Sequence, residues 1–370
     1  MKLGTFNLEN MFDRPKAMNL GTWQEGKRIL EDYYTLCSLI QEDYYSSNIK
    51  DELVTILKRN TGLLSDRESS YILLRDIRGN LFTRKGSNYT ITANGRKDWI
   101  GWFELKKEAV NEVATKNTAR VINEINADVI GLIEVENRTV LRYFNEIVLG
   151  FYHQKQYEHI MVIDGNDERG IDVGVMLNNG FYIKEMVSHV DDKDSIGTIF
   201  SRDCAEYHVV TPKSNELIVL INHFKSKGYG SASSSDSRRA RQAKRVKEIV
   251  KQRTEEGNPY IAVIGDLNDI PTNEPLLPLT TGLPQLIDIM SHPNYVSDGR
   301  SGTYGNGTQS NKIDYILLSS ALATKVISGG IERRGVWGGK NGTLFPHFDT
   351  ITSKVEAASD HAALWAEIDI

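Results

Sequence analysis

The sequence predicts an α/β protein with an insertion after its first strand. Uncharged runs at 129–135 and 260–264 are rich in β-branched residues, which is typical of strands buried on both faces. Residues 104–126 carry apolar side chains at helical spacing, and the segment 16–103 interrupts this pattern. A length of 370 residues allows either two domains or one large two-layer domain with an insertion.

Composition excludes several classes of protein. The chain is 40% hydrophobic and 25% charged, as ordinary globular proteins are. Its formal charge of -5 is unlike that of most nonspecific nucleic-acid binders, so contact with a polyanion requires a local patch or a metal. Cys37 and Cys204 are too few for a disulfide framework. Without a transmembrane stretch or an apolar signal region we expect a cytoplasmic protein, or a secreted one whose signal peptide was trimmed.

The insertion at 16–103 is expected to be mostly helical and to carry no catalytic residue. Apolar residues recur at helical spacing at 31–40 and 51–59, whereas 81–92 resembles a hairpin. Its clustered tyrosines fit core packing better than contact with a partner. A lid or a dimerisation surface is the alternative interpretation, and the sequence does not predict an oligomeric state.

Polar side chains follow the first two strands. The strand at 2–8 delivers Asn7 to its end, where a structural amide is the simplest interpretation of that residue alone. Glu134 emerges from the apolar run 129–135, and a buried carboxylate requires a cation or a hydrogen-bond donor. We therefore interpret Glu134 as a ligand.

The next strands end in a similar way. Asp172 lies near the start of a strand at 171–177, and the strand at 216–222 leads into His223 and Lys225. A lone histidine at a strand end is more often structural than catalytic. The neighbouring amide and lysines favour a functional role here.

A basic helix follows at 238–253, in which Arg238, Arg239 and Arg241 stand beside an apolar stripe. A solvated face is the usual explanation of such a charge run. A phosphate-contacting surface is the alternative, which we adopt because an acidic chain concentrates its positive charge here.

The strand at 260–264 leads into Gly-Asp-Leu-Asn-Asp, with Asp266 and Asn268 at the boundary between strand and loop. Groups placed there are held rigidly but remain open to solvent, as a metal-assisted active site requires. An Asx-rich turn is the structural alternative.

Two further acidic positions stand near the C-terminus. Asp314 lies inside an apolar strand at 312–318, where it must have a partner. Asp360 and His361 directly precede a closing strand at 362–370.

These segments resemble the endonuclease/exonuclease/phosphatase superfamily, with its DNase I-like and exonuclease III-like fold. The resemblance covers residues 1–14 and about 104–370, and its form is closest to bacterial extracellular-type nucleases. The matching segments, in family order, are Phe6-Asn-Leu-Glu-Asn, Val129-Ile-Gly-Leu-Ile-Glu-Val-Glu-Asn, Asp172-Val-Gly-Val, Asn222-His-Phe-Lys, Gly265-Asp-Leu-Asn-Asp, Lys312-Ile-Asp-Tyr-Ile-Leu and Ser359-Asp-His. The resemblance implies a four-layer α/β sandwich: two mixed sheets face to face with helices outside, in a single domain 1–370.

The resemblance also assigns a metal site. Glu134 is the implied main ligand of Mg²⁺ or Mn²⁺ (Ca²⁺ is possible), with Asn7 beside it and Asp360 completing the site. Oxygen ligands of this kind suit a labile divalent ion. His223 matches a second catalytic histidine that assists the leaving oxygen, and Asp172 is expected to pair with it.

The remaining implied roles concern the attacking water and the phosphate. Asp266 orients or deprotonates the water, and Asn268 holds a phosphate oxygen or the nucleophile. His361, positioned by Asp314, stabilises charge that develops on the phosphoryl group.

The predicted function is metal-dependent hydrolysis of a phosphodiester bond in nucleic acid, with DNA preferred over RNA. A phosphatase or phosphodiesterase acting on a small phosphorylated molecule or a lipid headgroup is the first alternative, because fold and metal do not fix the substrate. A partner-recruiting binding module ranks lower, since every matching segment keeps its polar residues.

Overall fold

The computed structural model describes residues 1–9, 11–20, 23–60, 62–63, 69–150, 154–167, 169–227 and 232–370. These residues form two compact units. The larger unit comprises Met1–Phe12, Val110–Lys227 and Ala232–Ile370, and the smaller one comprises Asp13–Ala109.

One sheet of the larger unit has the strand order β19-β20-β1-β8-β10-β9. Its strands are β19 (Val326–Glu332), β20 (Ala363–Ile368), β1 (Lys2–Asn7), β8 (Val129–Val135), β10 (Asp172–Leu177) and β9 (His159–Ile163). Because β1 runs parallel to β8 and antiparallel to β20, the ends of β1 and β8 and the start of β20 lie at one edge.

The other sheet has the order β11-β14-β15-β16-β18-β17. Its strands are β11 (Tyr182–Val187), β14 (Cys204–Val210), β15 (Glu216–His223), β16 (Ile261–Asp266), β18 (Asp314–Ser319) and β17 (Leu286–Asp288). The parallel pairing of β15 with β16 sets His223 opposite Asp266, and the antiparallel pairing of β16 with β18 sets Asp266 opposite Asp314.

The two sheets pack face to face. Ile133 of β8 and Ile264 of β16 belong to one buried cluster that draws on both sheets. The sheets approach so closely that a Cβ built on Gly131 would lie 2.5 Å from the Ile264 side chain. A larger residue at position 131 would therefore force the sheets apart.

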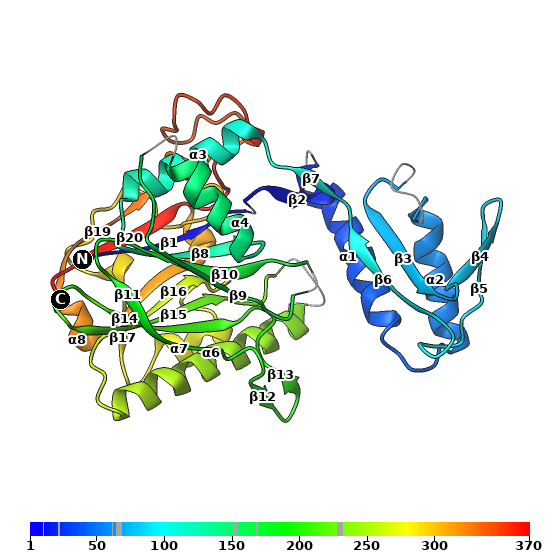
Figure 1. The fold of residues 1–370 in the computed structure, drawn as a ribbon, viewed down its shortest axis with the longest axis horizontal. Helices are drawn as coiled ribbons and strands as arrows, with labels where there is room; N and C mark the ends of the chain where they lie inside the picture. Colours follow the sequence, from blue (N-terminus) through cyan, green and yellow to red (C-terminus); the bar gives the residue numbers. More distant parts are fainter. Residues whose placement is uncertain are drawn as a thin grey trace. The chain divides into compact units, whose positions relative to one another are not determined.

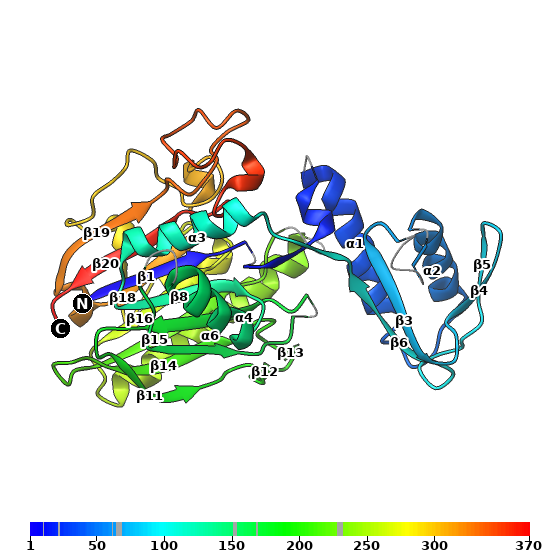
Figure 2. The ribbon, with the colours of Figure 1, turned by 45° about the horizontal axis from the view of Figure 1, so that its top comes forward.

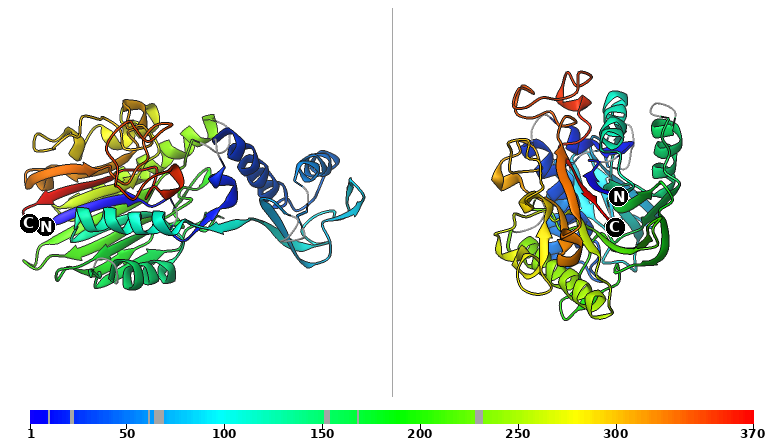
Figure 3. Two further views of the ribbon diagram at one scale, coloured as in Figure 1. Left: turned by 90° about the horizontal axis from the view of Figure 1, so that it is seen from above. Right: turned by 90° about the vertical axis from the view of Figure 1, so that its left-hand side faces the viewer.

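Helices cover the two outer faces. Helices α3 (Glu112–Ile125) and α4 (Arg138–Tyr143) share a buried cluster with the first sheet, and α6 (Ala232–Glu255) shares one with the second. Figures 1 and 2 show α3 and α4 on one side of the sheets and α6 on the other, and Figure 3 views the same layers from two further directions. The predicted four-layer α/β sandwich is confirmed.

Short elements complete the larger unit. They are the π-helix η2 (Phe144–Leu149), the strands β12 (Lys193–Asp194) and β13 (Gly197–Thr198), the helices α7 (Leu277–Thr280) and α8 (Ser320–Ala323), and the 3-10 helices η3 (Glu274–Leu276), η4 (Ile289–Ser291), η5 (Gln309–Asn311) and η6 (Lys354–Glu356).

The smaller unit has a buried cluster of its own, formed by residues between Ala17 and Leu105. It contains η1 (Lys16–Asn19), α1 (Trp23–Leu39), α2 (Ser47–Arg59) and the strand pairs β2 (Asp13–Pro15) with β7 (Lys107–Ala109), β3 (Ile72–Arg78) with β6 (Ile100–Leu105), and β4 (Phe82–Lys85) with β5 (Asn88–Ile91). The predicted helices and hairpin are present. We expected this segment to be mostly helical, and it contains three strand pairs in addition to its helices.

The predicted helix at 104–126 begins later than expected. Leu105 ends β6, residues 107–109 form β7, and Asn111 caps α3 by accepting a hydrogen bond from the Val113 N–H at 2.8 Å. Leu105 and Ala109 belong to strands and Val110 follows β7, so the spacing of the apolar residues alone was misleading. Among the described helices, none has the length and apolar character that crossing a membrane requires.

Candidate active site

The polar residues that follow the strands converge at one edge of the sandwich. Asn7 ends β1, and its Nδ2 donates to Asp266 Oδ2 at 3.2 Å. The same amide lies 3.4 Å from His361 Nε2. Asn7 therefore connects the first sheet to the second through side chains that are all almost completely buried.

Asp266 occupies the centre of this group. Its Oδ2 lies 3.7 Å from His223 Nε2 and 4.0 Å from His361 Nε2. Burial and the neighbouring Asp314 carboxylate raise the pKa of Asp266 to about 7. Asn268, with a φ of 53°, donates its backbone N–H to Asp266 Oδ1 at 2.8 Å, which orients the carboxylate.

His361 is held by Asp314, as predicted. The His361 Nδ1 lies 2.9 Å from Asp314 Oδ2, and the Thr303 hydroxyl donates to the same oxygen at 2.6 Å. Burial alone would lower the pKa of His361, but Asp314, Asp360 and Asp266 raise it well above its usual value. The ring is therefore a cation at neutral pH whose Nε2 faces Asp266.

The pKa of His223 is shifted in the opposite direction to that of His361. The guanidinium of Arg202 lies 3.2 Å from Nδ1 and 2.9 Å from Nε2 of this ring. Burial and this cation lower the pKa of His223 well below its usual value, so the ring is neutral. Arg202 in turn pairs with Asp167 at 3.3 Å.

The predicted pairing of Asp172 with His223 is wrong. Asp172 accepts a hydrogen bond from the Gly165 N–H at 2.8 Å. Burial and the nearby carboxylates of Asp164 and Asp167 raise its pKa to about 7. Asp172 is on the first sheet, and the loop that folds back over it places Asp167, and through it Arg202, nearer to His223.

The predicted phosphate-contacting helix is also corrected. Arg239 has no exposed surface and pairs with Asp269 at 3.1 Å. Arg241 pairs with Asp194 at 2.6 Å, and Arg238 donates to the Ile199 carbonyl at 3.2 Å. These arginines connect α6 to loops and to the β12–β13 pair of the larger unit, so their contacts lie within the protein.

Comparison with known proteins decides the family. A family model described as endonuclease/exonuclease/phosphatase matches residues 83–329, more than half of the chain. The chain belongs to this family. A search of curated proteins gives no significant match.

Solved structures of the family share the fold. A mannosyl-6-phosphatase from Bacteroides thetaiotaomicron VPI-5482 aligns with a TM-score of 0.50 and 16% identity, covering 70% of this chain and 92% of that one. The human Nocturnin catalytic domain with bound sulfate aligns with a TM-score of 0.50 and 15% identity, covering 71% and 88%. At such identities the likeness concerns the fold alone. Family membership and the site together make this protein a phosphoesterase.

Several residues of this family site offer oxygen to a divalent ion. The Glu134 side chain is only 13% exposed, and within the described chain its carboxylate accepts no hydrogen bond. Burial raises its pKa, and the neutral His223 ring lies beside it, with Nε2 at 3.8 Å from Oε1. A buried carboxylate with free lone pairs fits a cation. The Asp360 carboxylate raises the pKa of Glu134 further, as a nearby negative charge does, and these two residues with Asn7 remain the predicted metal ligands.

A second set of donor atoms could also hold an ion. One donor each from Asp266, Asp314 and His361 lie within 4.8 Å of one another. His361 and Asp314 already form a hydrogen bond with each other. The carboxylate of Glu134 therefore has more oxygen lone pairs available to a hard cation.

Sequence reasoning missed two residues that hold this site, Arg202 and Thr303. Arg202 precedes β14, a strand that we did not predict. The contact between Arg202 and His223 therefore could not be predicted from the sequence. Thr303 lies in a turn-rich loop, where a hydroxyl gives no distinctive signal. Glu9, which belongs to the Phe6-Asn-Leu-Glu-Asn segment at the end of the first strand, accepts the Asp360 N–H at 3.1 Å.

Proposed function

We propose that this phosphoesterase is a divalent-metal-dependent phosphodiesterase that hydrolyses nucleic acid, with DNA preferred over RNA. The observation that carries the proposal is the approach of Asp266 Oδ2 to two histidines, 3.7 Å from His223 Nε2 and 4.0 Å from His361 Nε2. A phosphoryl group beside Asp266 is then within reach of a base, a cationic donor and a neutral imidazole.

Each residue supports one part of the reaction. Asp266, with a pKa of about 7, is suited to orient a water molecule and accept its proton near neutral pH. The cationic His361 is suited to donate a hydrogen bond to a phosphoryl oxygen, where negative charge develops. His223, whose Nε2 lies 3.7 Å from Asp266 Oδ2, is suited to interact with the leaving oxygen. A divalent ion at Glu134, Asn7 and Asp360 would act as a Lewis acid on the phosphate.

Positive charge beside His223 supports an anionic substrate. Lys225 is half-buried, and burial followed by the cations Arg202 and Arg169 lowers its pKa to about 8. Cations that lower one another's pKa are stabilised when a phosphate enters between them. This group replaces the helix surface that the sequence had suggested for substrate binding.

A second candidate is a phosphatase that acts on a small phosphorylated sugar. Two findings favour it: one structural relative is a mannosyl-6-phosphatase, and the arginines of α6 are used within the protein. The catalytic groups described above serve both substrates equally well.

The test measures rates of hydrolysis in the presence of Mg²⁺ or Mn²⁺. The substrates are plasmid, linear duplex DNA, single-stranded DNA, RNA, bis(p-nitrophenyl) phosphate and mannose 6-phosphate. We expect nucleic acid and the diester to be cleaved. Chelator should abolish cleavage, and Glu134→Gln and His361→Ala should each reduce it by about 100-fold or more.

Glu158→Gln, a change at an exposed glutamate, is the matched control and should keep full activity. Hydrolysis of mannose 6-phosphate without cleavage of any diester would replace the proposal with the second candidate. Activity that survives both chelator and Glu134→Gln would refute the metal-dependent site.

A further inference from the structure

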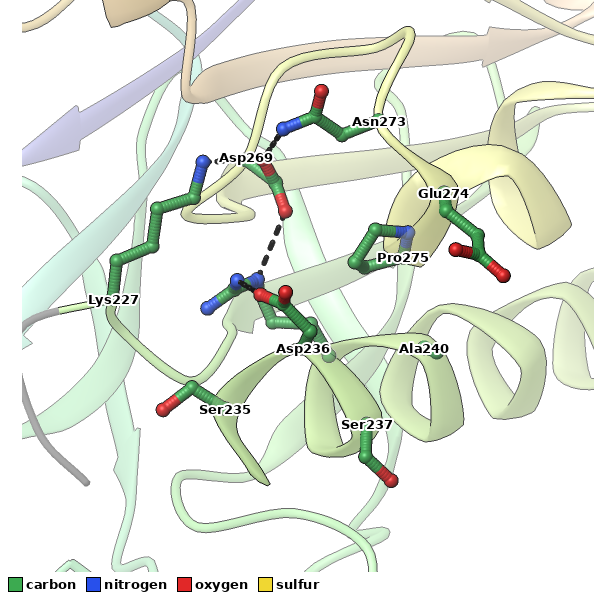
Figure 4. Close-up of a pocket in the computed structure, with 10 residues that line it drawn as sticks. Lys227, Ser235, Asp236, Ser237, Ala240, Asp269, Asn273, Glu274 and Pro275 are labelled. Atoms are coloured by element: carbon green, nitrogen blue, oxygen red, sulfur yellow. Dashed lines mark hydrogen bonds and ion pairs between the residues drawn. The ribbon is translucent and has the colours of Figure 1, made fainter. Parts of the chain in front are cut away.

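A concave region of the larger unit lies between α6 and the segment that follows Asp266. Its volume is about 520 Å³, a size that accommodates a small organic ligand. Figure 4 shows it between the first turns of α6, which carry Ser235, Asp236 and Ser237, and the loop that carries Asp269, Asn273 and Glu274. We call it the α6 pocket.

Residues that line the α6 pocket lie close in sequence to residues of the candidate active site. Lys227, on its wall, lies four residues after His223, and Asp269 lies three residues after Asp266. Three residues span at most about 11 Å even when fully extended. The pocket wall at Asp269 therefore lies within about 11 Å of Asp266, Cα to Cα, close enough for a group attached to a phosphate at Asp266.

One side of the pocket is fixed by the Asp269 carboxylate. It pairs with Lys227 Nζ at 2.5 Å and Arg239 Nε at 3.1 Å, and it accepts a hydrogen bond from Asn273 Nδ2 at 2.6 Å. The Tyr315 hydroxyl also donates to the Asp269 carbonyl at 2.7 Å. Because Asp269 and Arg239 are almost fully buried, this wall keeps its shape before any ligand binds.

The chemistry of the lining disfavours a phosphate as occupant. The cations Lys227 and Arg239 are outnumbered by the carboxylates Asp236, Asp269 and Glu274, which leaves a formal charge of -1. The Glu274 carboxylate and the Ser237 hydroxyl are exposed and make no hydrogen bond within the described part of the chain. Acceptors that are free in this way suit a neutral group with hydroxyl or N–H donors.

We infer that the α6 pocket binds the nucleoside next to the scissile phosphate, an inference that rests on the proposed action on nucleic acid. The sugar hydroxyls and the base N–H groups of a nucleoside supply the donors that Glu274 and Ser237 accept. The phosphate remains at Asp266, so the pocket adds affinity and selects substrates without taking part in the bond cleavage.

The test compares thymidine 5′-(p-nitrophenyl) phosphate with bis(p-nitrophenyl) phosphate, which has no nucleoside. Glu274→Ala and Ser237→Trp alter exposed side chains, so the fold is preserved. We expect each to raise KM for the thymidine ester about tenfold, the equivalent of about 1.4 kcal/mol, while kinetics with the other ester stay the same. Lys244→Trp, at an exposed position further along α6, is the matched control and should change neither substrate.

Inhibition of bis(p-nitrophenyl) phosphate hydrolysis gives an independent readout. Thymidine 3′- or 5′-monophosphate should inhibit more strongly than inorganic phosphate, and Ser237→Trp should remove that difference. Equal inhibition by nucleotide and phosphate, or equal KM changes for both esters, would overturn the pocket assignment. If the nucleotide advantage is present and sensitive to Ser237→Trp while no polymer is cleaved, the pocket assignment stands and only the nuclease proposal fails.

Discussion

The two histidines of the site differ because their nearest charged neighbours differ. Asp314 lies 2.9 Å from His361 Nδ1 and favours the protonated ring. Arg202 lies 2.9 Å from His223 Nε2 and favours the neutral one. Two chemically identical side chains beside Asp266 therefore have pKa values shifted in opposite directions.

Replacement of Asp314 by Asn tests this division. Because Asp314 raises the pKa of His361, the ring stays protonated to higher pH in the wild type than it would without that carboxylate. Asp314→Asn should move the alkaline limb of the kcat profile to lower pH and reduce kcat at its optimum by about 100-fold. The measurement is a pH–rate profile with bis(p-nitrophenyl) phosphate. An alkaline limb that stays in place would show that it does not report His361.

At the scale of elements, charged side chains attach α6 to the second sheet. Glu206 of β14 is fully buried and lies 2.7 Å from His208 Nε2, 3.0 Å from His189 Nε2 and 2.6 Å from Arg253 Nε of α6. Burial alone would raise the pKa of Glu206, but hydrogen bonds from His189, Arg253 and His208 outweigh it and lower the pKa to about 2. The folded protein therefore stabilises the ionised carboxylate.

Glu206→Gln should destabilise the protein at neutral pH by about 3 kcal/mol. Since the folded-state pKa lies below the ordinary value of 4.5, this stabilisation is present above that pH and is lost as the pH falls toward 2. Urea unfolding of both proteins across this range should show the difference shrinking with acidification. Glu216→Gln, at a more exposed partner of His208, should cost less than about 1 kcal/mol. A pH-independent difference would assign the loss at position 206 to packing.

At the scale of the whole molecule, the chain leaves and re-enters the larger unit at neighbouring points. The Val110 N–H donates to the Phe12 carbonyl at 2.7 Å. The smaller unit between them has its own buried cluster, which shares no residue with the clusters of the sandwich. A segment of this kind can be removed without opening the core of the remainder.

Deletion of residues 13–109, with a Gly-Ser linker of about four residues in their place, should leave a folded and active enzyme. We expect metal-dependent hydrolysis of bis(p-nitrophenyl) phosphate to stay within about threefold of the wild type, because the described catalytic residues all lie in the larger unit. Activity assays and light scattering check this. Loss of activity toward polymers alone would assign the segment to a lid, and a halved mass in solution would assign it to dimerisation. Failure to fold would refute the independence of the two units.

The sequence by itself determined the strands whose ends hold the candidate site residues, and the family to which the chain belongs. The runs that became β8 and β16 are uncharged and β-branched, so their burial depends only on local composition. The polar groups at their ends, including Glu134 and Asp266, were predictable because a charge beside a buried strand requires a function or a partner. The pairing of His361 with Asp314 followed from the resemblance.

Only the tertiary structure decided which charges meet across the two sheets. Arg202 reaches His223 from the segment before β14, which has no clear sequence signal, and Asp172, which the sequence had paired with that histidine, binds its own loop instead. The basic residues of α6 gave a strong sequence signal, yet Arg239 is fully buried against Asp269. The physical reason is the same in each case. Composition reveals that a charge is present, but its partner is set by packing between segments far apart in the chain, and that packing determines whether the charge binds substrate or holds the fold.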